Sequence, residues 1–95
     1  MSNELIVKRE QAKLAIIDLI ENGPIPVELE GFRTPTMIDF VMYLHTTPDQ
    51  YLRLVQAMAG RGLDPFLEDY RREGADWYFA ITVETFDWKP EAQAS

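Results

Sequence analysis

Two periods of hydrophobic residues run along the chain, and each predicts a different kind of element. Residues 3–21 contain no Gly or Pro and place Ala12, Ile16 and Leu19 at helical spacing. This pattern predicts a long first helix. Gly23 follows it and is expected to end the helix in the left-handed conformation that favours glycine.

Strands are predicted where hydrophobic and polar residues alternate. Residues 25–32 show this alternation, with Val27 and Leu29 separated by a glutamate. The strand is expected to start after Pro26 or to lie at an edge of the sheet, because proline cannot donate a hydrogen bond to a ladder. Residues 76–86 are rich in aromatic and β-branched side chains and predict a second, longer strand.

Three further helices are predicted from a shared local pattern, in which an oxygen-bearing side chain precedes a proline at the first helical position. The pattern occurs at Thr34-Pro35, Thr47-Pro48 and Asp64-Pro65. At the second of these sites Gln50 lies three residues after Thr47, so the two residues form a capping box. The predicted helices cover residues 35–45, 48–59 and 65–73.

These elements predict one α+β domain over residues 1–88, with four helices packed on a small antiparallel sheet in the order α-β-α-α-α-β. Helix 35–45 has few polar residues and is expected to be the central buried helix. Residues 89–95 contain no large apolar residue that could dock on the domain. They are predicted to form a disordered tail.

Composition limits the environment in which this domain works. The chain has 95 residues, of which 46% are hydrophobic, so it can build one modest core. It has no cysteine, which excludes disulfides and thiolate-bound zinc and fits a reducing compartment. The first residues lack the uninterrupted apolar stretch of a secretory signal, and we therefore expect a cytoplasmic protein.

The net charge is −7, and the acidic residues are concentrated late in the chain. Residues 64–91 contain eight acidic and three basic side chains. A surface of this sign repels phosphate backbones and anionic lipid headgroups, and it attracts basic protein surfaces. Direct binding of nucleic acid or of membranes is therefore not expected.

Few residues are suited to catalysis. His45 is the only histidine and is expected to have a structural role at the end of a helix. The serines are confined to the termini, and the glycines are too scattered for a phosphate-binding loop. No catalytic, metal or cofactor site is expected, and an enzyme that binds a small anionic substrate through Arg33, Arg53 or Arg61 is a remote alternative.

The sequence therefore favours a non-enzymatic protein-binding module, such as a small acidic inhibitor or immunity-type protein that occludes a basic surface. Small acidic proteins of this kind are common in phages and mobile elements. An alternative is a structural or assembly protein that acts as a homo-oligomer. In both cases a homodimer is expected, through pairing of strand 76–86 or packing of helix 35–45. The predicted contact residues are Glu68, Asp69, Glu73, Asp76, Trp77, Glu84 and Asp87.

Overall fold

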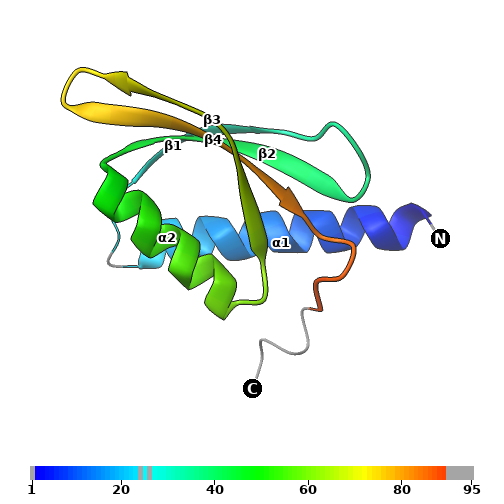
Figure 1. Ribbon diagram of the computed structural model, residues 1–95. Helices are drawn as coiled ribbons and strands as arrows, with labels where there is room; N and C mark the ends of the chain where they lie inside the picture. Colours follow the sequence, from blue (N-terminus) through cyan, green and yellow to red (C-terminus); the bar gives the residue numbers. More distant parts are fainter. Residues whose placement is uncertain (1, 24, 26, 90–95) are drawn as a thin grey trace.

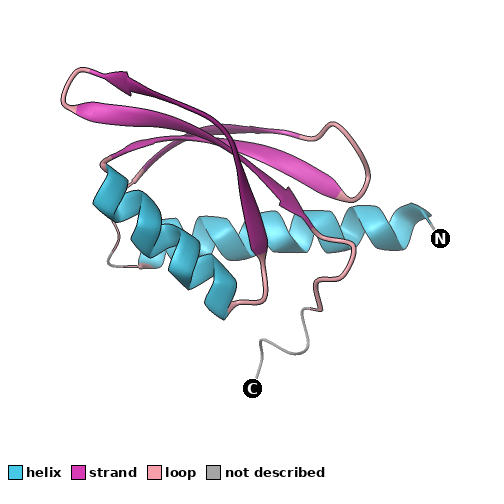
Figure 2. Ribbon diagram, viewed as in Figure 1, coloured by secondary structure: helices cyan, strands magenta, loops and turns pink. Residues whose placement is uncertain are grey.

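Alternating hydrophobic residues in the middle of the chain form a sheet, and helices cover one of its faces. The computed structural model describes residues 2–23, 25 and 27–89. These residues form α1 (Ser2–Asn22), β1 (Glu28–Arg33), β2 (Asp39–Thr46), α2 (Pro48–Gly60), β3 (Asp64–Glu73) and β4 (Asp76–Glu84). The strands make one antiparallel sheet in the order β1-β2-β4-β3. Both helices lie on the same side of it (Figure 1 and Figure 2).

The hydrophobic core lies between this helix layer and the inner face of the sheet. Phe40, Met42 and Leu44 alternate along β2 and are fully buried. They lie beside Ile81 and Val83 of β4, which is paired with β2. The helices complete the core with Ala12, Ile16, Leu54 and Met58.

The predicted α+β class is confirmed, but the order with four helices is wrong. Residues 35–45 do not form a helix. Residues 35–38 form a loop, and residues 39–45 belong to β2. Thr36 makes a local turn in which its hydroxyl accepts a hydrogen bond from the Ile38 amide (3.2 Å). β2 carries apolar residues on both faces, with Phe40, Met42 and Leu44 toward the helices and Val41 and Tyr43 on the other side. That composition also fits a buried helix, which explains the wrong prediction.

Residues 65–73 were also expected to be helical and instead belong to β3. Pro65 is tolerated there because β3 is an edge strand. Gly74, which the sequence suggested as a helix stop, has a φ of 68° and forms the turn of the β3–β4 hairpin. Pairing with β4 in this hairpin therefore decides the conformation of the segment.

The other elements were predicted correctly, with one difference at a cap. The first helix, helix 48–59, the strand after Pro26 and the strand that begins at residue 76 are all present. Thr47 caps α2, since its hydroxyl accepts a hydrogen bond from the Gln50 amide (3.3 Å). The capping box is incomplete, because the buried Gln50 Oε1 makes no hydrogen bond within the described residues.

Gly23 ends α1 for a reason other than the expected one. The glycines of positive φ in the described chain are Gly62 and Gly74, so Gly23 does not have a left-handed conformation. A Cβ atom at residue 23 would instead clash with the backbone carbonyl oxygen of Leu19. Glycine is required there by close packing against the last turn of the helix.

The close packing at Gly23 predicts opposite effects on stability for alanine at residues 23 and 60. Gly23→Ala is expected to lower the free energy of unfolding by about 1–3 kcal/mol, because backbone atoms must move to admit the Cβ. Gly60→Ala is the matched control, since no atom lies within 4 Å of a Cβ at that helical position. It is expected to raise stability by about 0.4–1 kcal/mol. Urea denaturation measures both, and equal effects at the two glycines would contradict the packing argument.

The uncovered face of the sheet

The face of the sheet opposite the helices is not covered by any element of the described chain (Figure 1). Successive side chains of a strand point to opposite faces, so the strand register identifies the residues on this side. We call this set the open face. It comprises Glu28, Glu30, Gly31 and Arg33 of β1; Asp39, Val41, Tyr43 and His45 of β2; Asp64, Phe66, Glu68, Asp69, Arg71 and Glu73 of β3; and Asp76, Tyr78, Ala80, Thr82 and Glu84 of β4.

Negative charge is concentrated on the open face. Of the 16 acidic residues in the chain, nine are in this set, together with only two of the nine basic residues. The rest of the sequence contains seven acidic and seven basic residues, which cancel. The open face therefore accounts for the whole net charge of −7.

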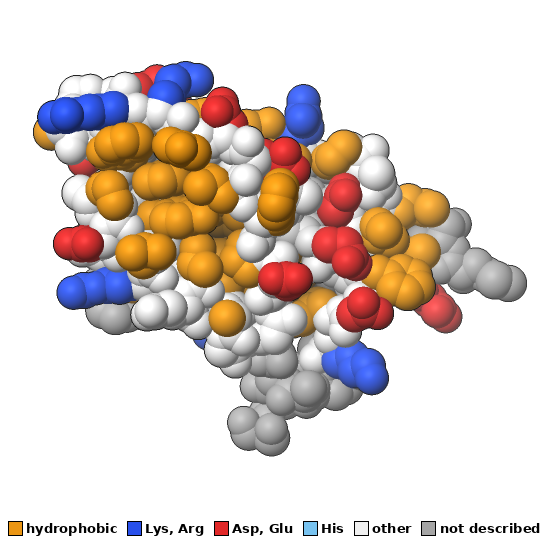
Figure 3. Space-filling model, viewed as in Figure 1, with side chains coloured by type: hydrophobic (Ala, Val, Ile, Leu, Met, Phe, Trp, Pro, Cys, Tyr) orange, Lys and Arg blue, Asp and Glu red, His pale blue; other side chains and the backbone are white. Residues whose placement is uncertain are grey.

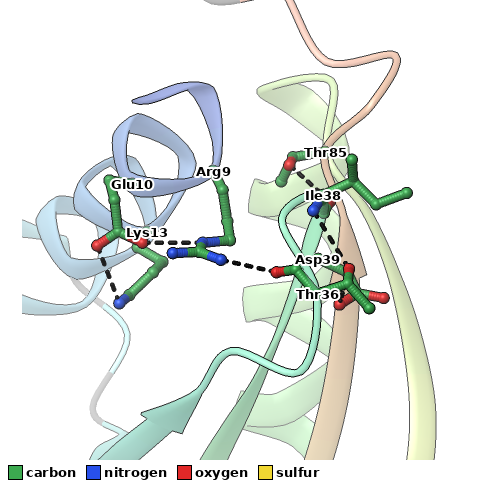
Figure 4. Close-up of polar contacts among 7 residues, drawn as sticks. All are labelled: Arg9, Glu10, Lys13, Thr36, Ile38, Asp39 and Thr85. Carbon is green, nitrogen blue, oxygen red and sulfur yellow. Dashed lines mark hydrogen bonds and ion pairs between the residues drawn. The ribbon is translucent and has the colours of Figure 1, made fainter. Parts of the chain in front are cut away.

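One row of carboxylates crosses three strands at the end of the sheet. Asp39, Glu84 and Asp64 are register partners on β2, β4 and β3. The loop before Asp39 is fixed by Arg9 of α1, which donates to the Thr36 carbonyl oxygen (2.7 Å), and by the Thr85 hydroxyl (Figure 4). These bonds hold Asp39 and the loop before it in place at the end of the sheet.

The centre of the open face is apolar and aromatic. The rings of Tyr43 and Tyr78 stack with centroids 6.1 Å apart. Beside them lie Val41 and Ala80, each only 6% exposed although no helix covers them. These residues line a depression of about 450 Å³ whose rim includes the carboxylate of Asp69. The open face thus has an apolar centre within an acidic border.

His45 connects three strands on this face. Its Nδ1 pairs with Glu30 of β1, and its Nε2 bonds to Glu73 of β3 (2.5 Å). Arg71 also donates to Glu73 (2.7 Å) and lies 4.2 Å from the centroid of the Tyr78 ring. His45 thus joins β2 to both edge strands, and it lies in a strand and not at the end of a helix as expected.

The hydrogen bond to Glu73 raises the pKa of His45 above its ordinary value of 6.5. The negative charge of Glu30 acts in the same direction. The bond also lowers the pKa of Glu73, which Arg71 lowers further. The charged form of His45 therefore stabilises the contact between the two edges of the sheet.

This contact predicts a pH-dependent stability. A raised folded-state pKa gives stability that is fully present below the unfolded pKa and is lost as the pH rises through the folded value. The urea midpoint is therefore expected to fall as the pH rises above about 6.5, the ordinary pKa of histidine. His45→Gln is expected to remove this dependence. A wild-type midpoint that is flat or rises over this range would contradict the prediction.

The predicted contact residues are divided between the two sides of the sheet. Glu68, Asp69, Glu73, Asp76 and Glu84 lie on the open face. Trp77 points to the helix side, where its ring stacks with those of Tyr70 and Phe79. Asp87 lies in the turn after β4.

The sequence interpretation missed Asp39, Tyr43 and Tyr78 as parts of this surface. No local signal marked the two β2 residues, because residues 40–44 are apolar throughout and do not alternate with polar ones. The three arginines considered for anion binding do not converge. Arg33 lies on the open face, whereas Arg53 is on α2 and Arg61 pairs with Asp18 of α1 (3.2 Å).

Within the described residues, no group of three or more acidic or histidine side chains is arranged to hold a metal ion. In the same part of the chain, neither helix has the length and apolar character needed to cross a membrane. Comparison of the chain with family models, curated proteins and solved structures finds no match in any of the three. The function is therefore argued from the geometry of the surface alone.

Proposed function

We propose that this protein is a non-enzymatic binding module that covers a basic surface of a partner protein with its open face. The partner's function is blocked by occlusion, as in a small acidic inhibitor or immunity-type protein. The observation that carries this proposal is the coincidence of three properties on one face. The open face is not covered by any described element, it contains the whole excess of negative charge, and its centre is aromatic.

The charge distribution supports a basic partner. Carboxylates of one sign on one face create a directed field, which accelerates encounter with a positive surface and disfavours negatively charged ones. The seven acidic and seven basic residues in the rest of the sequence give no such net attraction. A partner is therefore expected to approach the sheet and not the helices.

The centre of the face supports a protein as the ligand. Protein interfaces combine a desolvated centre rich in tyrosine with a polar rim. Tyr43 and Tyr78 supply large rigid rings, and Val41 and Ala80 leave space beside them for a partner side chain. The acidic border then provides orientation and solubility, because charges at a rim contribute more to encounter than to affinity.

The proposal is tested with three immobilised proteins: the wild type, a variant that loses negative charge on the open face, and a control variant that loses the same charge on the helices. The open-face variant is Glu28→Gln/Asp64→Asn/Asp76→Asn, whose carboxylates make no hydrogen bond or ion pair within the described residues. The control is Glu4→Gln/Glu21→Gln/Asp49→Asn, which removes the same charge from the helices. Proteins from the native host are retained at about 50 mM salt and eluted at about 0.5 M.

The wild type and the helix control are expected to retain the same basic protein, with the open-face variant binding it about tenfold more weakly. Elution by salt is expected because the attraction is screened. Equal retention by all three forms, retention that does not respond to salt, or retention of no basic protein contradicts the proposal.

A further inference from the structure

β3 leaves one side of its backbone without a partner strand in the described chain. It is ten residues long and lies at the edge of the sheet, next to β4. The Tyr70 amide donates to the carboxylate of the preceding Asp69 (2.9 Å). Counting from the pair Glu73–Asp76 at the hairpin turn, Tyr70 and Phe79 form a pair without hydrogen bonds, so the Tyr70 amide and carbonyl point away from β4. Such an edge is available to another strand unless its side chains oppose pairing. The expected pairing through strand 76–86 is wrong, because β4 has a strand on both sides.

The charges on either side of Tyr70 match the charges of a second, antiparallel copy of the same strand. Asp69 precedes Tyr70 and Arg71 follows it, and both lie on the open face. In an antiparallel pair related by a two-fold axis through Tyr70, each Asp69 is opposite Arg71 of the second copy. Two ion pairs between oppositely charged residues then form, whereas an edge whose charges all had one sign would repel a second copy.

On the helix side of the sheet, aromatic side chains also extend as far as the edge strand β3. A row of stacked rings runs from Tyr51 of α2 through Phe79 and Trp77 to Tyr70. Tyr70 is the exposed end of the row, at 60% exposure. Figure 3 shows hydrophobic side chains gathered between the β3–β4 hairpin and α2. A two-fold axis through Tyr70 places the two Tyr70 rings side by side and joins the two rows.

We propose that the protein forms a homodimer in which β3 pairs antiparallel with β3 of a second copy, centred on Tyr70. The Tyr70 amide then donates to the Tyr70 carbonyl of the second copy, and the Asp69 carboxylate is released to pair with Arg71. The two sheets become one continuous sheet whose open faces point to the same side. This inference does not rest on the proposed function, because it concerns the sheet edge and not its face.

Charge exchange at the two positions tests the register. In Asp69→Arg and in Arg71→Glu, each homodimer would place like charges opposite each other twice, and its dissociation constant is expected to rise roughly 100-fold or more. An equimolar mixture of the two variants restores both opposite-sign pairs and is expected to form a heterodimer. Arg33→Glu, on the opposite edge of the sheet, is the control and is expected to dimerise like the wild type.

The masses are measured by light scattering and analytical ultracentrifugation at tens of micromolar, with circular dichroism to verify folding. A monomeric wild type, variants that dimerise like the wild type, or a mixture that stays monomeric overturns the proposal.

A second test of the dimer does not depend on charge. Tyr70→Cys is expected to form a disulfide-linked dimer under mild oxidation, because the chain has no other cysteine. Phe86→Cys, exposed in the turn after β4, is the control, and equal cross-linking at both positions also overturns the proposal.

Discussion

Phe40→Ala is expected to lower the free energy of unfolding by about 3–5 kcal/mol, one of the two largest effects in this protein. Phe40 is fully buried in β2 between the sheet and the helix layer. Its ring meets that of Phe32 edge to face, with centroids 5.6 Å apart. The substitution removes this contact and leaves a cavity that the surrounding strands can only partly fill.

The matched control for Phe40 is Tyr43→Ala, on the other face of the same strand. Tyr43 is partly exposed and loses mainly its stacking with Tyr78, so about 1 kcal/mol is expected. Urea denaturation followed by circular dichroism measures both variants. Losses of equal size would contradict the assignment of one face of β2 to the core and the other to the surface.

Trp88→Ala is expected to have the second large effect, also about 3–5 kcal/mol. Trp88 follows β4 and is only 5% exposed, in contact with the core. Its indole Nε1–H donates to the carbonyl oxygen of Arg61, just after α2 (2.9 Å). This residue therefore fastens the segment after β4 to the end of α2, and alanine removes both the packing and the hydrogen bond.

Trp88→Phe separates these two contributions. Phenylalanine keeps most of the apolar contact and loses the indole hydrogen bond, so a loss of about 1–2 kcal/mol is expected. The measurement is again the urea midpoint. A Trp88→Ala variant as stable as the wild type, or a phenylalanine variant as unstable as the alanine variant, would contradict this account of the segment.

Local signals predicted α1 and α2 correctly and failed in the two segments that form β2 and β3. Thr47-Pro48 begins a helix, whereas Thr34-Pro35 and Asp64-Pro65 have the same pattern and do not. Residues 40–44 are apolar on both faces of β2, so the alternation that marks a strand is absent there. The β3 segment is stabilised by its pairing with β4, which no local pattern contains.

The acidic surface was predictable only in part. The excess of acidic residues after residue 63 is visible in the sequence and supplies six of the nine open-face carboxylates. Glu28, Glu30 and Asp39 come from β1 and β2, and only the strand register brings them to the same face. The alternation of residues 77–83 places Trp77 on the same side of the strand as Phe79, Ile81 and Val83, and in the structure this is the helix side.

The claim that the open face binds the partner is tested most directly by amide NMR spectroscopy. The labelled protein is titrated with the basic protein that the wild-type form retains. The largest shift changes are expected in the middle of β2 and β4, at Val41, Tyr43, Tyr78 and Ala80. Changes confined to α1 and α2, with the sheet amides unmoved, would contradict the proposed function.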